Sequence, residues 1–222
     1  LKWSRRSLLY SVRNIGYQCT IGISALMGEG TMAVLTLVGN YVFITYMGDP
    51  GVGAFGIACY YTPFVYMIGN AVAQSAQPII SYNYGAKEHA RVAKLYQLTL
   101  GMSAVIMAAG TVICMAASAP LIGLFSSTPE TIAIGQTALR IICLGFVVSS
   151  VSTTSSGALE GLGKGAASLV ISLCRYVIFI MPLAWLLCRQ LGPTGVWHAF
   201  WVTEVLSAVI AFAVYRKSVI KK

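Results

Sequence analysis

Residues 74–94 read QSAQPIISYNYGAKEHARVAK and join two long stretches that carry no charge. No Asp, Glu, Lys or Arg occurs in residues 50–86, and none occurs in residues 95–129. Residues 87–94 contain two lysines, an arginine, a glutamate and a histidine. A short basic loop between apolar stretches of this length is typical of a cytoplasmic loop that joins two transmembrane helices. Gly85 is expected to end the first helix, and the charged residues begin the next.

The composition indicates an all-α protein that crosses a membrane several times. Of the 222 residues, 57% are hydrophobic and 9% are charged, and the mean hydropathy is +0.77. A soluble domain carries about 25% charged residues, so this chain has too little polar surface for a soluble fold of its size. The apolar stretches are continuous, whereas strands of a membrane barrel alternate apolar and polar residues. We therefore predict a polytopic bundle of six transmembrane helices.

The six predicted spans are separated by turns rich in glycine and proline, such as the Gly-Asp-Pro-Gly turn at residues 48–51. They are expected to form a single six-helix membrane lobe over residues 1–222. Their approximate bounds are 17–47, 53–82, 92–122, 138–162, 167–188 and 196–215.

Lys and Arg residues gather on one side of this predicted topology. Six spans place both ends of the segment on the same side as residues 85–94 and 161–165. That side holds Lys2, Arg5, Arg6, Arg13, Lys87, Arg91, Lys94, Lys164, Arg216, Lys217, Lys221 and Lys222, whereas Arg189 alone lies in the opposite loops. Because positive loops stay in the cytoplasm, we predict that both ends are cytoplasmic and that the protein lies in the cell (inner) membrane. The same placement argues against nucleic-acid binding, despite the net charge of +9.

Three charged residues are expected near the middle of the membrane, where each charge costs at least about 2.5–3.5 kcal/mol. They are Glu29, Arg175 and Glu204. Arg175 and Glu204 lie on neighbouring antiparallel spans, so one interpretation is a buried ion pair that only orients two helices. The other is that Glu204 binds a cation or substrate. Glu29 has no evident partner, which favours a cation or proton site.

Two spans carry many polar side chains. Asn70, Gln74 and Gln77 recur at helical spacing and form a polar stripe, which must face protein or water rather than lipid. The serines and threonines of residues 149–156 favour either close helix packing or a water-lined face.

The sequence contains none of the common catalytic motifs, and we predict that the protein is not an enzyme. The six cysteines form no CxxC pair and lie in or beside apolar spans, so free thiols are expected rather than a metal site. We also expect no cofactor.

Four segments resemble the second six-helix half of the multidrug and toxic compound extrusion (MATE) family. They read GNYVFITYMGDPGVGAFGIACY (39–60), QSAQPIISYNYGAKEHARVAKL (74–95), GALEGLGKGAASLVISLCRYVIFIMPLAWLL (157–187) and GPTGVWHAFWVTEVLS (192–207). The resemblance implies a twelve-helix transporter in two lobes, of which this chain would supply the second. The N-terminal six-helix lobe would then be the missing partner.

The resemblance further implies an antiporter that exports organic, often cationic, compounds by alternating access, with Na⁺ or H⁺ as the coupling ion. It adds Asn40 to Glu29, Asn70, Gln74, Gln77 and Glu204 as candidate cation-binding or substrate-binding residues. The alternative function is a flippase for lipid-linked oligosaccharides or other amphiphiles, which can share the two-lobed architecture.

Overall fold

The computed structural model describes the backbone of residues 5–220. Side chains are described from Asn14 to Val219, except at positions 17, 20, 21, 24, 25, 27–29, 31, 32 and 35. All the regular elements in this part of the chain are helices, which confirms the predicted all-α class.

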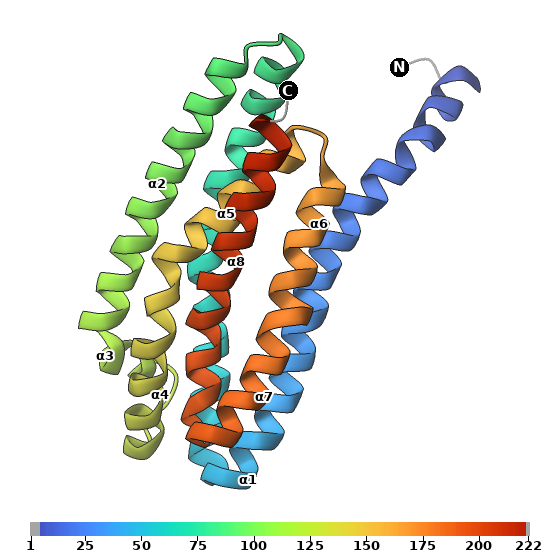
Figure 1. The fold of residues 1–222 in the computed structure, drawn as a ribbon. Coiled ribbons are helices and arrows are strands. Elements are labelled where there is room, and N and C mark those ends of the chain that lie inside the picture. The colour runs from blue at the N-terminus through green and yellow to red at the C-terminus, as the bar shows by residue number, and fades with distance from the viewer. Residues whose placement is uncertain (1–4, 221–222) are drawn as a thin grey trace.

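The first helix, α1 (Arg5–Gly85), is folded back on itself at Gly48. Gly48 has φ 65° and ψ −160°, a left-handed conformation that glycine adopts without steric cost. Figure 1 shows the first leg of α1 descending to this turn and the second leg returning beside it. Backbone dihedrals stay helical at Pro63 and Pro78, so the break falls at the predicted Gly-Asp-Pro-Gly turn rather than at either proline.

The remaining helices form four further long rods and one short helix. They are α2 (His89–Ala116), α3 (Ser118–Gly123), α4 (Pro129–Ile142), the 3₁₀ turn η1 (Cys143–Gly145), α5 (Phe146–Gly161), α6 (Gly165–Leu173), the π-helix η2 (Cys174–Phe179), α7 (Ile180–Leu191) and α8 (Thr194–Ile220). The segments α4, η1 and α5 follow one another without a loop, as do α6, η2 and α7 (Figure 1).

Five helices of the described chain are long and apolar enough to cross a membrane. They span Thr36–Gly85, His89–Ala116, Pro129–Gly161, Gly165–Leu191 and Thr194–Val219, and the first of them contains the turn at Gly48.

Three helix bounds differ clearly from the sequence-based expectation, the first being the start of α1 at Arg5 rather than at residue 17. The span expected at 92–122 is broken after Ala116, and a separate helix, α3, follows. Pro120 lies in the first turn of α3, where backbone N–H groups have no partner within the helix, so the N–H that proline lacks is not needed. The span expected to begin at 138 begins instead at Pro129, the first position of α4, and Glu130 follows in the first turn. A proline and an acidic residue both favour a helix start.

Two buried apolar clusters hold the helices together at opposite ends of the lobe. Near the Gly48 turn, Phe43 stacks on Phe55 at 4.9 Å and on Trp197 at 4.5 Å between ring centroids. At the other end, Tyr96 of α2 stacks on Tyr215 of α8 at 3.9 Å. Such aromatic pairs contribute beyond their buried area, so they fix the spacing of α1, α2 and α8.

The hydroxyl-rich part of α5 is a packing face. Ser149, Ser152, Thr153 and Ser155 are buried. The Ser149 hydroxyl donates to the carbonyl of Phe146, and those of Ser152 and Thr153 donate to that of Ser149. These bonds satisfy the three hydroxyls within α5, and the Ser155 hydroxyl pairs with that of Tyr96 in α2, so small side chains can face neighbouring helices at little cost. Of the two alternatives for this span, the structure therefore favours close packing.

Glycines let α5 approach the second leg of α1 closely. A Cβ atom added at Gly157 would lie 3.1 Å from the Cβ of Ala73, and one added at Gly161 would lie 3.0 Å from the carbonyl oxygen of Gln77. The two helix backbones are therefore in near contact, an arrangement that small residues allow in membrane proteins.

We predict that Gly157→Val destabilises the lobe by about 1–3 kcal/mol, because the added side chain must push α5 away from α1. Gly56→Val in α1 is the matched control, since an added Cβ there meets no atom within 4 Å. Thermal unfolding of the purified full-length protein in detergent would measure both. Equal melting temperatures for the two variants would contradict the close contact at Gly157.

Candidate functional site

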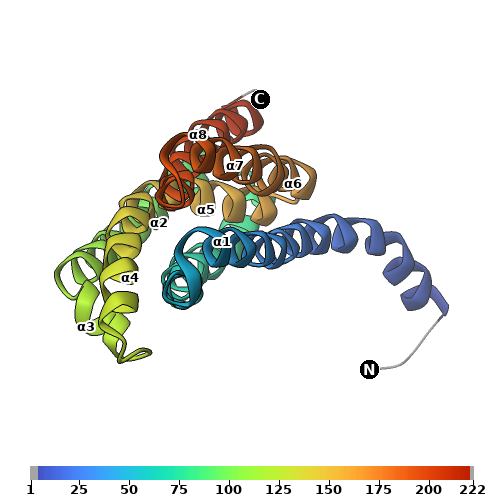
Figure 2. The same ribbon diagram turned by 90° about the horizontal axis from the view of Figure 1, so that it is seen from below.

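A buried ion pair lies in the interior of the lobe, where α8 packs against the rod formed by α6, η2 and α7 (Figure 2). The Nη2 atom of Arg175 donates to Oε1 of Glu204 at 2.6 Å. The exposed fractions of these residues are only 8% and 5%. Each lies ten residues past the start of its rod, Gly165 for Arg175 and Thr194 for Glu204, which is about 15 Å at 1.5 Å per residue. That depth is half of a hydrocarbon core of about 30 Å.

The π-helix η2 positions Arg175. Its wider turn spans Cys174–Phe179, and the N–H of Ile180 bonds the carbonyl of Arg175, five residues back. Pro182 follows closely and lacks the N–H that would bond the carbonyl of Ile178 in a regular α-helix. Single π-turns are rare and occur frequently at functional sites, so the geometry of this rod singles out the neighbourhood of Arg175.

Aromatic rings surround the guanidinium group of Arg175. It lies 4.9 Å from the ring centroid of Tyr66 in α1 and 5.2 Å from that of Tyr176. Tyr66 in turn meets Phe146 of α5 edge to face at 5.8 Å. Cation–π contacts gain strength when water is excluded, so the rings offset part of the cost of burying this charge.

One oxygen of Glu204 is incompletely satisfied. Its Oε2 atom is buried and makes no hydrogen bond of ordinary geometry with the described residues, although the Tyr66 hydroxyl lies close enough to interact with the carboxylate. The hydroxyls of Thr203 and Ser207 on α8 are also without a partner among the described residues. A buried acceptor without a partner costs about 1–3 kcal/mol. A proton or a small cation could bind this oxygen, and either would weaken the bond from Arg175.

Gln77 has a partner that the sequence did not indicate. Its Nε2 donates to Oε2 of Glu160 in α5 at 2.9 Å, and Ser168 of α6 donates to the other carboxylate oxygen at 2.8 Å. This network joins α1, α5 and α6 near their basic end. Of the three residues in the predicted polar stripe, Gln77 is half-buried and faces Glu160, whereas Asn70 and Gln74 are exposed.

The other candidate residues differ from the ion pair in their exposure. Asn70 and Gln74 are exposed on the second leg of α1, and Asn40 is half-buried on the first leg. The ion pair is buried against Tyr66, Tyr176 and Gly145. Glu29 lies in the helical backbone of α1, but its side chain is outside the described residues.

Sequence reasoning missed Tyr66, Tyr176 and the partners of Gln77. Tyr66 is one of 12 tyrosines and has no distinguishing neighbour in the sequence. The position of Tyr176, directly after a mid-membrane arginine, was the only available signal.

Comparisons with known proteins connect this lobe to one family. The family model described as MatE matches residues 24–186. The chain is 24% identical over 196 residues to the multidrug export protein MepA of Staphylococcus haemolyticus, covering 88% of this chain and 43% of that protein. It spans less than half the length of the curated relatives it matches.

Solved structures show the same fold. The chain superimposes with a TM-score of 0.82 on an outward-facing multidrug resistance MATE family transporter, covering 90% of this chain and 46% of that one at 20% identity. It superimposes equally well, at 0.82 and 20% identity, on an inward-facing one, covering 99% and 50%.

We predict that Arg175→Met alone destabilises the protein by about 3–5 kcal/mol, because it leaves the Glu204 carboxylate buried without its partner. The double variant Arg175→Met/Glu204→Gln should recover most of this loss, since no unpaired charge remains. Unfolding curves in detergent for both single variants and the double variant would measure the coupling. Strictly additive losses would mean that the two side chains do not interact.

Proposed function

The chain belongs to the MatE family, and from that premise we propose that it forms one half of a cation-coupled multidrug antiporter that works by alternating access. The observation that carries the proposal is the buried Arg175–Glu204 pair, in which one carboxylate oxygen of Glu204 makes no hydrogen bond of ordinary geometry with the described residues. A charged group at this depth is costly, and such groups mark ion and proton pathways in membrane proteins.

The proposed partner is a second six-helix lobe that precedes this one in the full-length protein. The length of the relatives supports it, since this chain covers 43% of one and 39% of another. The exposed amides of Asn70 and Gln74 also support it, because they lie well inside the second leg of α1 and polar groups there do not face lipid. The missing lobe, or an aqueous cleft between the lobes, would cover them.

The face that carries these amides suits an organic cation. Tyr60, Phe64 and Met67 precede Asn70 and Gln74 at spacings of three or four residues, so all five share one side of α1. Tyr60, Phe64 and Met67 are exposed by 73%, 64% and 69%. Aromatic faces attract cations and stack on flat rings, while the amides supply hydrogen bonds. We assign this side of α1 to the substrate cleft.

The coupling ion is proposed to shift the balance between two arrangements of the lobes. Na⁺ or H⁺ bound at Glu29, or at the free oxygen of Glu204, would neutralise a carboxylate and change its preferred surroundings. The equal match to outward-facing and inward-facing structures supports a lobe that keeps its own fold while the lobes rock.

The orientation with both ends in the cytoplasm is part of the same proposal. The 86–88 and 162–164 loops lie at the same end of the bundle as the start of α1 and the end of α8 (Figure 1). Lys87, Lys164, Arg216 and Lys217 lie at this end, and clusters of positive charge face the cytoplasm.

We predict that Glu29→Gln in the full-length transporter abolishes ion-coupled efflux of a fluorescent organic cation without lowering expression. The amide keeps the shape of the side chain but cannot bind a proton or attract Na⁺. Efflux from energised cells, normalised to the amount of protein in the membrane, is the measurement. Glu130→Gln is the matched control, because Glu130 is exposed in the first turn of α4 and should not affect transport.

Undiminished coupling in Glu29→Gln would remove Glu29 from the mechanism. A wild-type protein that exports no organic cation at all would instead favour the alternative function, a flippase for lipid-linked oligosaccharides.

A further inference from the structure

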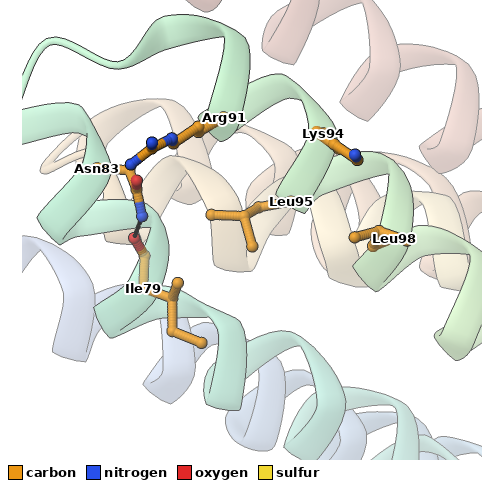
Figure 3. A pocket seen from close by; sticks show the side chains of 6 residues that line it. All are labelled: Ile79, Asn83, Arg91, Lys94, Leu95 and Leu98. Carbon is orange, nitrogen blue, oxygen red and sulfur yellow. Dashed lines mark hydrogen bonds between the residues drawn. The ribbon is translucent and has the colours of Figure 1, made fainter.

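A groove lies between the second leg of α1 and the first turns of α2, at the basic end of the lobe. Its volume is about 200 Å³. It is lined by Ile79, Asn83, Arg91, Lys94, Leu95 and Leu98 (Figure 3). Arg91 extends toward Asn83 beside the loop, whereas Lys94 extends in the opposite direction along α2, on the side of Leu98 (Figure 3). Both cations come from the first two turns of α2 and form the charged end of the groove, and Ile79, Leu95 and Leu98 form its apolar part.

The charged end is cationic and open. Arg91 and Lys94 are exposed and three residues apart, so they share one side of α2. Lys87 is exposed in the preceding loop. The nearest acid is Glu88, whose Oε2 lies 4.0 Å from the Nε of Arg91, and both side chains are largely exposed. This distant, solvated contact leaves the remaining guanidinium donors of Arg91 and the ammonium group of Lys94 for an anion.

A second, mostly apolar groove continues from the first along α2. It has a volume of about 460 Å³ and is lined by Gln97, Leu98, Gly101, Met102, Val105 and Ile106. Leu98 belongs to both grooves. An added Cβ at Gly101 would meet no atom within 4 Å, so the absence of a side chain there deepens the groove.

The dimensions match one leaflet of a bilayer. From Lys94 to Ile106 is twelve residues of α2, or about 18 Å at 1.5 Å per residue. Half of a hydrocarbon core of about 30 Å is about 15 Å, the depth that an acyl chain spans. The cations thus lie at the level of the phosphates when the apolar groove lies beside the acyl chains.

We propose that this double groove binds one anionic glycerophospholipid, with its phosphate at Arg91 and Lys94 and an acyl chain along Leu98, Gly101 and Val105. Basic pockets next to transmembrane helices select acidic headgroups in this way. A free phosphate would leave the apolar groove exposed to water, and a neutral lipid would leave the two cations without a net counter-charge. The inference uses the membrane location of α2 but none of the residues assigned to transport.

The headgroup contact is tested with phosphatidylglycerol and phosphatidylcholine added to the full-length protein in detergent, with retained lipid counted by native mass spectrometry. The wild-type protein should retain phosphatidylglycerol selectively. Arg91→Gln/Lys94→Gln should lower its affinity roughly fivefold for each cation removed. The control variant Arg216→Gln/Lys217→Gln removes two positive charges from exposed positions of α8, at the same end of the lobe as the groove. It should leave the phosphatidylglycerol affinity unchanged.

The acyl-chain contact is tested with Gly101→Leu, which fills the apolar groove and keeps both cations. This variant should lose phosphatidylglycerol while its weak binding of soluble glycerol phosphate stays at the wild-type level. If the Arg216/Lys217 control lost as much phosphatidylglycerol affinity as the Arg91/Lys94 variant, net charge alone would explain the binding, and the proposed site would be overturned. Retention of both lipids alike, or of neither, would also overturn it, the latter because another part of the protein would then cover the groove.

Discussion

A lipid bilayer offers no hydrogen bonds, so each polar group inside it must find a partner within the protein. This constraint accounts for the purely helical backbone of the described chain, since a helix satisfies its own N–H and C=O groups. It also accounts for Ser149, Ser152 and Thr153 of α5, whose hydroxyls bond carbonyls one turn back. Charged side chains cannot be satisfied within one helix, and they therefore tie helices to one another.

Two such ties lie at different depths in the lobe. Near the basic end, Glu160 accepts hydrogen bonds from Gln77 and Ser168, so both of its oxygens are used and α1, α5 and α6 are held together. Near the middle, Glu204 accepts from Arg175 through one oxygen and leaves the other without a described partner. A complete network favours one rigid arrangement, whereas an incomplete one can take up a proton or an ion. The proposed transport function draws on the incomplete one.

The outer surface of the lobe also has two chemically different parts, one on the second leg of α1 and one on α2. The exposed side of the second leg of α1 mixes aromatic rings with amides, which a lipid environment does not accommodate. The exposed side of α2 is basic at Arg91 and Lys94, near the start of the helix, and mostly aliphatic from Leu95 to Ile106. This order follows the polarity of a lipid molecule. The first surface suits a second lobe and a substrate, and the second suits the bilayer.

The sequence alone was sufficient to predict the helical membrane class, the turn at Gly48 and the family resemblance. Hydropathy, turn-forming glycine and proline residues and motif spacing are all local properties of the sequence. It also placed Arg175 and Glu204 at matching depths, since depth follows from counting residues along a helix. Only the tertiary structure decided which side chains meet. Each residue turns a helix by about 100°, so a small change in helical rotation moves a side chain from one neighbour to another. The π-helix at Cys174–Phe179 shifts that rotation within the rod, which the periodicity of the sequence does not reveal. For the same reason the sequence does not reveal that Gln77 meets Glu160 or that Tyr66 covers Arg175.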